Sequence, residues 1–194
     1  MSLYSLALFI HILGALGLFA STGVNHLVLV RLRRAGTVAQ VRDLLEMTRA
    51  VATFEPVVAL ALLGAGLYLT ATTWGWQVAW IDVSLGAVLA LVAVGVVVGA
   101  PRVAARARAA ADAPEGPIPA ALAARIDDPV LWTLTRAALA LQLGIVFLMT
   151  TKPGLAGSLA TLGVALALGL ISAVPGWRGA ARTPHEGAGA PAEG

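Results

Sequence analysis

Long apolar stretches, separated by short polar segments, dominate the pattern along the chain. The first stretch runs from residue 3 to residue 30, and a helix needs ~20 apolar residues to cross the hydrocarbon core of a bilayer. Four later stretches are also long enough. The pattern therefore predicts five transmembrane helices, at residues 3–30, 56–74, 78–100, 129–151 and 155–174.

The first stretch has two different faces when its residues are placed on a helix. One face combines small and polar residues: His11, Gly14, Ala15, Leu18, Thr22, Asn25 and His26. The opposite face is apolar and mostly large: Leu6, Phe9, Leu13, Leu16, Ala20 and Leu27. Transmembrane helices pack through small and polar residues, so we expect the first face to meet other helices and the second to meet lipid.

The segment at residues 37–52 has apolar residues at helical spacing with charged residues between them. This pattern predicts an amphipathic helix, either on the membrane surface or as an extension of the second span. Pro56 is expected to start or kink that span. The tight turn between Trp74 and Trp80 predicts a hairpin of spans two and three, with these rings in an aromatic belt.

The later connections also carry local signals. The alanine-rich segment after Pro101 is expected to be loose, with a short helix at 120–125. Asp127 or Asp128 is predicted to cap the fourth span. Pro175 and the glycine after it are expected to end the fifth span. The domain prediction is thus a helix bundle at residues 1–177 and a disordered tail at 178–194.

Composition agrees with this pattern and excludes a soluble globular domain. Hydrophobic residues make up 59% of the 194 residues, and charged residues only 12%, which is more apolar surface than a soluble domain of this size can bury. The fold class is therefore an all-α polytopic membrane helix bundle. The chain has no cysteine, so it has no disulfide framework and no thiolate metal site.

The arginines predict the orientation of the bundle. They concentrate in the loop after the first span, in the loop after the third span and after the fifth span, whereas Lys152 is the one basic residue of the other two loops. Positive loops face the cytoplasm. The N-terminus is thus expected outside and the C-terminus inside. The basic residues set topology, so we expect the lipid bilayer as partner and no nucleic acid; homo-oligomerisation is left open.

Five ionisable residues fall within or at the edge of the spans: His11, His26, Glu55, Asp82 and Arg136. Such groups cost roughly 2.5–3.5 kcal/mol each on insertion scales, so each needs a partner or a purpose. His11 and Asp82 lie in the outer half, with Ser84 at a comparable depth. One hypothesis is that His11 donates a hydrogen bond to Asp82 or to a hydroxyl and serves only helix packing. The other is a polar pocket around His11.

In the inner half, Glu55 and Arg136 lie at a similar depth on spans two and four, near Asn25 and His26. An ion pair between Glu55 and Arg136 would neutralise both charges and hold the two spans together. The structural interpretation of this pair is favoured over a role in chemistry.

Catalytic motifs are missing from the chain: there is no nucleophile elbow, phosphate loop or metalloprotease motif. His11 and His26 lie fifteen residues apart, or ~22 Å along one helix. They cannot both bind one haem iron or one metal ion. Whether the protein is an enzyme is left open.

Four features of the chain are worth comparing with known families: Phe9-Ile10-His11-Ile12-Leu13-Gly14, Glu55-Pro56, Trp80 at the start of span three, and Phe147-Leu148-Met149-Thr150-Thr151-Lys152-Pro153. Together they resemble a bacterial family of predicted integral membrane proteins of unknown function. More distantly, the chain is similar to HemJ-type protoporphyrinogen oxidase and to the copper-resistance D membrane proteins. The resemblance implies the bacterial inner membrane as location.

In HemJ-type proteins a histidine of the first helix binds haem b. The resemblance therefore makes His11 the candidate axial ligand. From the residues themselves, Asp82 or a hydroxyl such as that of Ser84 could hold its other nitrogen, and Gly14 and Ala15 would leave room for a flat ligand. Ser84 stands where those proteins have a lysine, and Leu18 where they have a tryptophan, so the oxidase activity is not carried over. The remaining hypotheses are transport of copper or a small solute, and a structural or assembly subunit.

Overall fold

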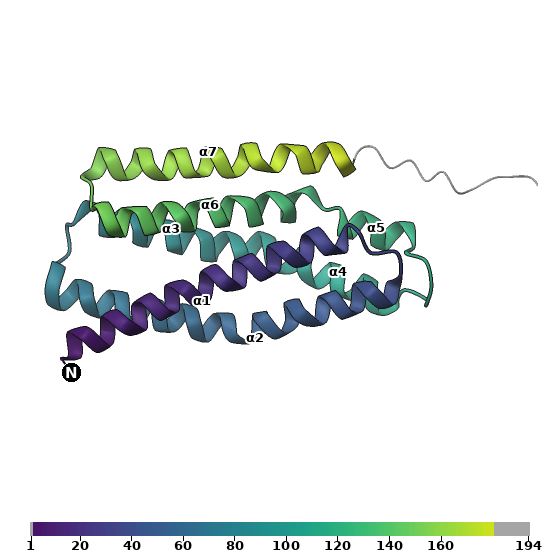
Figure 1. Cartoon of the computed structure of the whole chain (residues 1–194), viewed down its shortest axis with the longest axis horizontal. Coiled ribbons are helices and arrows are strands. Elements are labelled where there is room, and N and C mark those ends of the chain that lie inside the picture. Colours follow the sequence, from purple (N-terminus) through teal and green to yellow (C-terminus); the bar gives the residue numbers. More distant parts are fainter. Residues whose placement is uncertain (1, 181–194) are drawn as a thin grey trace, which may run out of the picture.

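The computed structural model describes residues 2–180 and consists almost entirely of helices (Figure 1). Within this range five helical units are long and apolar enough to cross a membrane. The protein is therefore an all-α, multi-pass integral membrane protein. The helices are α1 (Leu3–Leu32), α2 (Val38–Leu69), α3 (Ala79–Val94), α4 (Ala100–Asp112), α5 (Ala120–Ile126), α6 (Pro129–Thr151) and α7 (Leu155–Ala180), with π-helical turns at Thr70–Trp74 and Gly95–Gly99.

Two antiparallel hairpins form the main contacts of the bundle (Figure 1). Helices α1 and α2 pair along their lengths, and α6 pairs with α7. Helix α1 also packs on α6, and α3 packs on both α6 and α7. The lipid-facing side predicted for α1 is exposed, with Phe9, Leu13 and Leu16 each more than half accessible.

The two ends of the bundle differ in chemistry. We call the end that holds the α1–α2 and α4–α5 loops the basic end, because it carries Arg33, Arg42 and Arg102. The opposite end is the aromatic end, where Trp74 meets Trp80 edge to face at 5.4 Å between ring centroids. Lys152 ends α6 in the left-handed conformation, at φ 51°, and places its Nζ 4.3 Å from the Trp74 ring centroid. This cation–π contact joins the end of α6 to the α2–α3 turn.

Helix α6 agrees with the sequence prediction at both bounds. Asp128 is its cap, and its Oδ1 accepts a hydrogen bond of 2.8 Å from the Val130 amide. Asp127, the other candidate cap, instead pairs with Arg33 at 3.5 Å. The local signal thus predicted this helix correctly, because a cap and a proline in the first turn act through neighbouring residues only.

The amphipathic segment at 37–52 is the first part of α2, which runs without interruption through Pro56. Of the two alternatives, the extension of the second span is the one found. Its apolar face is covered by protein: Val38 and Val41 are fully buried in a small core at the basic end. That core also contains Val28, Leu32, Ala110, Leu122 and Ile126 from α1, α4 and α5.

Two sequence predictions at the basic end are wrong, the first of them only in part. The segment after Pro101 is not loose at first, because α4 continues the line of α3 as far as Asp112; alanine has the highest helix propensity, and Ala110 is buried in the small core. The short helix expected at 120–125 is confirmed as α5, and residues 113–119 before it are not helical. Pro175 does not end the fifth span, since α7 continues to Ala180. Prolines are tolerated in membrane helices when neighbouring helices support the backbone. The predicted tail lies largely outside the described residues.

Arg42 of α2 holds the last turn of α4 in place. Its guanidinium donates hydrogen bonds to the carbonyl oxygens of Ala110, Ala111 and Ala113, at 3.0, 3.3 and 2.8 Å, and it pairs with Glu115. Carbonyls in the last turn of a helix have no partner within the helix. Arg42 therefore satisfies groups that would otherwise need water.

We expect Arg42→Ala to lower the free energy of unfolding by about 1–2 kcal/mol, because a partly exposed charged donor loses several backbone acceptors. Limited proteolysis should show faster cleavage between residues 112 and 120. Arg49→Ala is the control, since Arg49 is an exposed arginine on the same helix. Equal effects of the two substitutions would contradict this role of Arg42.

The orientation of the bundle stays a prediction, and the absence of native cysteine makes it easy to test. A single cysteine at Thr73, an exposed residue of the aromatic end, should react with an impermeant maleimide added to intact cells. One at Ala111, exposed at the basic end, should react only after the cells are opened. The opposite labelling pattern would reverse the assignment of inside and outside.

Candidate functional site

The outer-half residues singled out from the sequence lie in three separate surroundings. The Nδ1–H of His11 donates a hydrogen bond of 3.0 Å to the carbonyl oxygen of Leu62 in α2. The Ser84 hydroxyl is buried and donates to the Trp80 carbonyl one turn earlier, at 2.6 Å. Asp82 is exposed in the first turn of α3, where a carboxylate is stabilised by the helix dipole.

His11, Asp82 and Ser84 therefore do not form a common pocket. Within residues 2–180, no hydrogen bond or ion pair joins any two of them. The packing interpretation of His11 as a hydrogen bond between helices matches its geometry, but its acceptor is a backbone carbonyl rather than Asp82.

The space expected beside His11 for a flat ligand is filled. A Cβ atom on Gly14 would lie only 2.9 Å from the Leu62 Cβ and 3.0 Å from its Cα, so the two backbones are in contact there. On the α2 side, a Cβ on Gly66 would lie 3.0 Å from the His11 ring. The residues around His11 thus do not fit a haem on the face where Gly14 and Ala15 were expected to leave room for it.

This contact generates a prediction for the α1–α2 pair. Gly14→Ala should lower the unfolding free energy by about 1–3 kcal/mol, because backbone atoms of α2 cannot yield to the added methyl group. Gly23→Ala on the same helix meets nothing within 4 Å and should be neutral or slightly stabilising. Thermal unfolding in a mild detergent compares the two. If Gly14→Ala melts no lower than Gly23→Ala, the close contact is not as described.

The inner-half residues form a different arrangement from the predicted one. Arg136 and Glu55 make no ion pair in the described part of the chain, and that prediction is wrong. The physical reason is the order of the helices: α1 packs on both α2 and α6, and Arg136 meets residues of α1 instead. Glu55 stays half-buried on α2.

Trp132 of α6 is the centre of the arrangement that forms instead. The guanidinium carbon of Arg33 lies 4.1 Å from its ring centroid and that of Arg136 lies 4.7 Å away. The His26 ring centroid is 5.4 Å from the same indole, tilted by 45°. We call His26, Arg33, Trp132 and Arg136 the cationic cluster. Three of its four side chains carry or can carry positive charge.

Arg33 and Arg136 differ in whether a carboxylate balances their charge. Arg33 follows the last residue of α1, pairs with Asp127, and donates to the Gly176 carbonyl at 3.4 Å. Burial lowers the pKa of Arg33; the carboxylate of Asp127 opposes that shift, and the charge of Arg136 adds to it. Arg136 has no carboxylate partner among the described residues, and its Nε is buried without a hydrogen bond.

Further buried polar atoms of α1 and α6 lack partners. These are Nδ1 of His26, Oδ1 of Asn25, Nε1 of Trp132 and Oε1 of Gln142, all buried. The amide nitrogen of Gln142 is satisfied, because it donates to the Thr22 hydroxyl across α1 and α6 at 2.8 Å. Buried polar atoms are nearly always bonded, so the unpaired atoms of His26, Trp132 and Arg136 call for an explanation.

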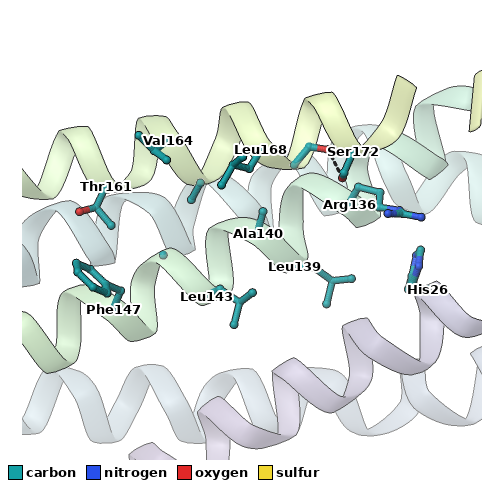
Figure 2. Close-up of a pocket in the computed structure, with 13 residues that line it drawn as sticks. His26, Arg136, Leu139, Ala140, Leu143, Phe147, Thr161, Val164, Leu168 and Ser172 are labelled. Atoms are coloured by element: carbon teal, nitrogen blue, oxygen red, sulfur yellow. Dashed lines mark hydrogen bonds between the residues drawn. The ribbon is translucent and has the colours of Figure 1, made fainter. Parts of the chain in front are cut away.

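A cleft begins at this cluster and continues along α6 and α7 (Figure 2). Its volume is about 460 Å³, within the range of small-molecule sites. His26 projects from α1 toward Arg136 at one end, and Leu143, Phe147 and Val164 line the rest. Neither this cleft nor a second one between α1 and α2 includes His11.

Sequence reasoning found His26 and Arg136 but missed Arg33 and Trp132. Trp132 lies four residues before Arg136, and Arg33 lies seven after His26. Both are spacings that place side chains on one helix face. The same spacing test that sorted the faces of the first span would have found them. What it cannot find is which faces of α1 and α6 meet.

Comparison of the chain with protein-family models, with curated proteins and with solved structures gives no match. The resemblance to HemJ-type and copper-resistance D proteins thus stays a prediction. Among the residues whose positions are described, no group of three or more His, Cys, Asp or Glu residues could hold a metal ion. The cationic cluster and its cleft are the candidate site.

Proposed function

We propose that this integral membrane protein binds an anionic ligand at the cationic cluster. The observation that carries the proposal is Arg136, a guanidinium within a membrane-spanning helix that has no carboxylate partner in the described chain. Charged groups in a bilayer are costly and are usually paired. A bound anion would supply the missing charge.

The geometry of the cluster suits a phosphate or carboxylate. A guanidinium presents several N–H donors in a fixed plane that matches two oxygens at once. The Arg136 guanidinium lies on Trp132, which limits its rotation, and Arg136 lines the cleft. His26 of α1 lines the same end of the cleft.

Binding also agrees with the electrostatic balance of the cluster. Asp127 offsets the charge of Arg33, so Arg136 carries the net positive charge there. One negative charge on the ligand would bring the site to neutrality. This role needs no catalytic group, and it fits an uptake, transfer or sensing protein equally well.

A structural subunit is the competing function. In that case Arg136 only stacks on Trp132 within α6, and Arg33 stacks on the same ring and holds the end of α1 to α6. The two functions make opposite predictions for the protein without ligand. Removing an unpaired buried charge should not destabilise it, whereas removing a structural contact should.

The test uses butyl phosphate as the anion and protein purified in an uncharged detergent. At one hundred times the dissociation constant, a ligand stabilises the folded state by about 2.7 kcal/mol, so the melting temperature should rise. Arg136→Gln should abolish the rise and leave the melting temperature without ligand unchanged or higher. Arg125→Gln, which removes an exposed arginine of α5, should keep the rise.

Two results would count against this function. The first is an equal rise in the wild type and in Arg136→Gln. The second is no rise in the wild type together with a lower melting temperature of Arg136→Gln alone, which would support the structural subunit.

A further inference from the structure

The cleft described above is a groove with small residues at its floor and larger side chains at its walls. Small residues bring the backbones of α6 and α7 together: a Cβ on Gly144 would lie 3.0 Å from the Ala165 Cβ, and one on Gly169 would lie 2.8 Å from the Ala137 Cα. Larger side chains on either side then form its walls (Figure 2). They include Leu139, Leu143 and Phe147 of α6 and Val164 and Leu168 of α7.

Charge is confined to one end of this groove. Among the described residues, His26 and Arg136 are the only ionisable ones that line it. The two hydroxyls that line it are already used, because Ser172 donates to the Gly169 carbonyl and Thr161 to the Gly157 carbonyl, at 2.8 and 2.9 Å. Apart from its charged end, the groove therefore presents an apolar surface to its occupant.

The groove is long enough for an alkyl chain. On α6 it extends from Arg136 to Phe147, which is ~16 Å at 1.5 Å per residue. Arg136 lies seven residues after the first residue of α6 and Phe147 lies four before the last, so the groove passes the middle of this membrane-spanning helix. A lipid chain anchored at the charged end would lie along the groove and extend past the bilayer midplane.

From the charged end, the apolar walls and this length, we infer that the groove holds one chain of an anionic, long-chain amphiphile from the leaflet at the basic end. Its anionic head contacts Arg136 and His26, and its chain lies between α6 and α7. The inference rests on the proposed anion binding and adds the class of ligand. A free anion or a helix of a second copy would satisfy only one part of the groove.

The experiment compares dodecyl phosphate with butyl phosphate, which share the head and differ in the chain. Dissociation constants are measured with the purified full-length protein in an uncharged detergent. The wild type should bind dodecyl phosphate at least tenfold more tightly than butyl phosphate. Val164→Trp places an indole in the groove from a position that is 60% exposed. It should reduce the affinity for dodecyl phosphate about tenfold and leave that for butyl phosphate unchanged.

Ile171→Trp is the matched control. Ile171 is on the same helix, is 66% exposed, and does not line the groove. It should bind both phosphates as the wild type does, which separates a filled groove from the effect of an added indole or of partition into the detergent.

Each outcome is decisive. If Val164→Trp binds dodecyl phosphate as tightly as Ile171→Trp does, the chain does not lie in the groove, while wild-type binding of butyl phosphate would still support the anion site. If neither phosphate binds the wild type, the proposed function fails as well. If Val164→Trp instead converts a dimer into a monomer in size-exclusion chromatography, the groove holds a second copy and the inference is overturned.

Discussion

Hydrocarbon offers no hydrogen bonds, and this constraint decides what becomes of each polar side chain in the spans. Most hydroxyls donate to a carbonyl four residues earlier in their own helix, as Ser21, Thr22, Thr70, Ser84 and Thr135 do. A hydroxyl satisfied in this way is compatible with lipid or with a packed helix. Ser84 is therefore no longer a candidate ligand-binding residue, although its hydroxyl and its depth in the membrane made it one in the sequence analysis.

The cationic cluster departs from this rule because guanidinium groups cannot be satisfied within one helix. Arg33 forms an ion pair with Asp127 and a cation–π contact with the ring of Trp132. Arg136 shares the ring and has no carboxylate in the described chain. Stacking on an aromatic face orients a charge without neutralising it. Position and remaining charge together make Arg136, and not His11, the residue around which a binding function can be argued.

Close helix contacts explain why one candidate site is closed and the other open. At Gly14 the backbone of Leu62 fills the space above the glycine, and the His11 ring lies against Gly66. Between α6 and α7 the backbones also approach closely, at Gly169 and Ala137. Large side chains such as Phe147 and Val164 border that contact and leave a groove between them. Small residues thus produce either a sealed interface or the floor of a cleft, depending on their neighbours.

The sequence by itself determined the features that depend on near neighbours along the chain. The five spans follow from apolar length, the lipid face of α1 from the positions of residues such as Leu13 and Leu16, and the start of α6 from its cap at Asp128. The resemblance of the chain to a haem-binding group is a further sequence prediction, untested by the comparisons.

Only the tertiary structure decided which polar residues meet. Depth in the membrane placed Glu55 and Arg136 together, but depth is one coordinate. Rotation of each helix and the order of helices around the bundle supply the others, and these brought His26 and Arg33 from α1 and its end to Trp132 of α6. The same holds for α4 and for Pro175, where Arg42 and close packing on α6 sustain helices whose local signals indicated an end. Contacts between distant segments outweighed local propensity there, because each adds bonds or burial that no short stretch of sequence contains.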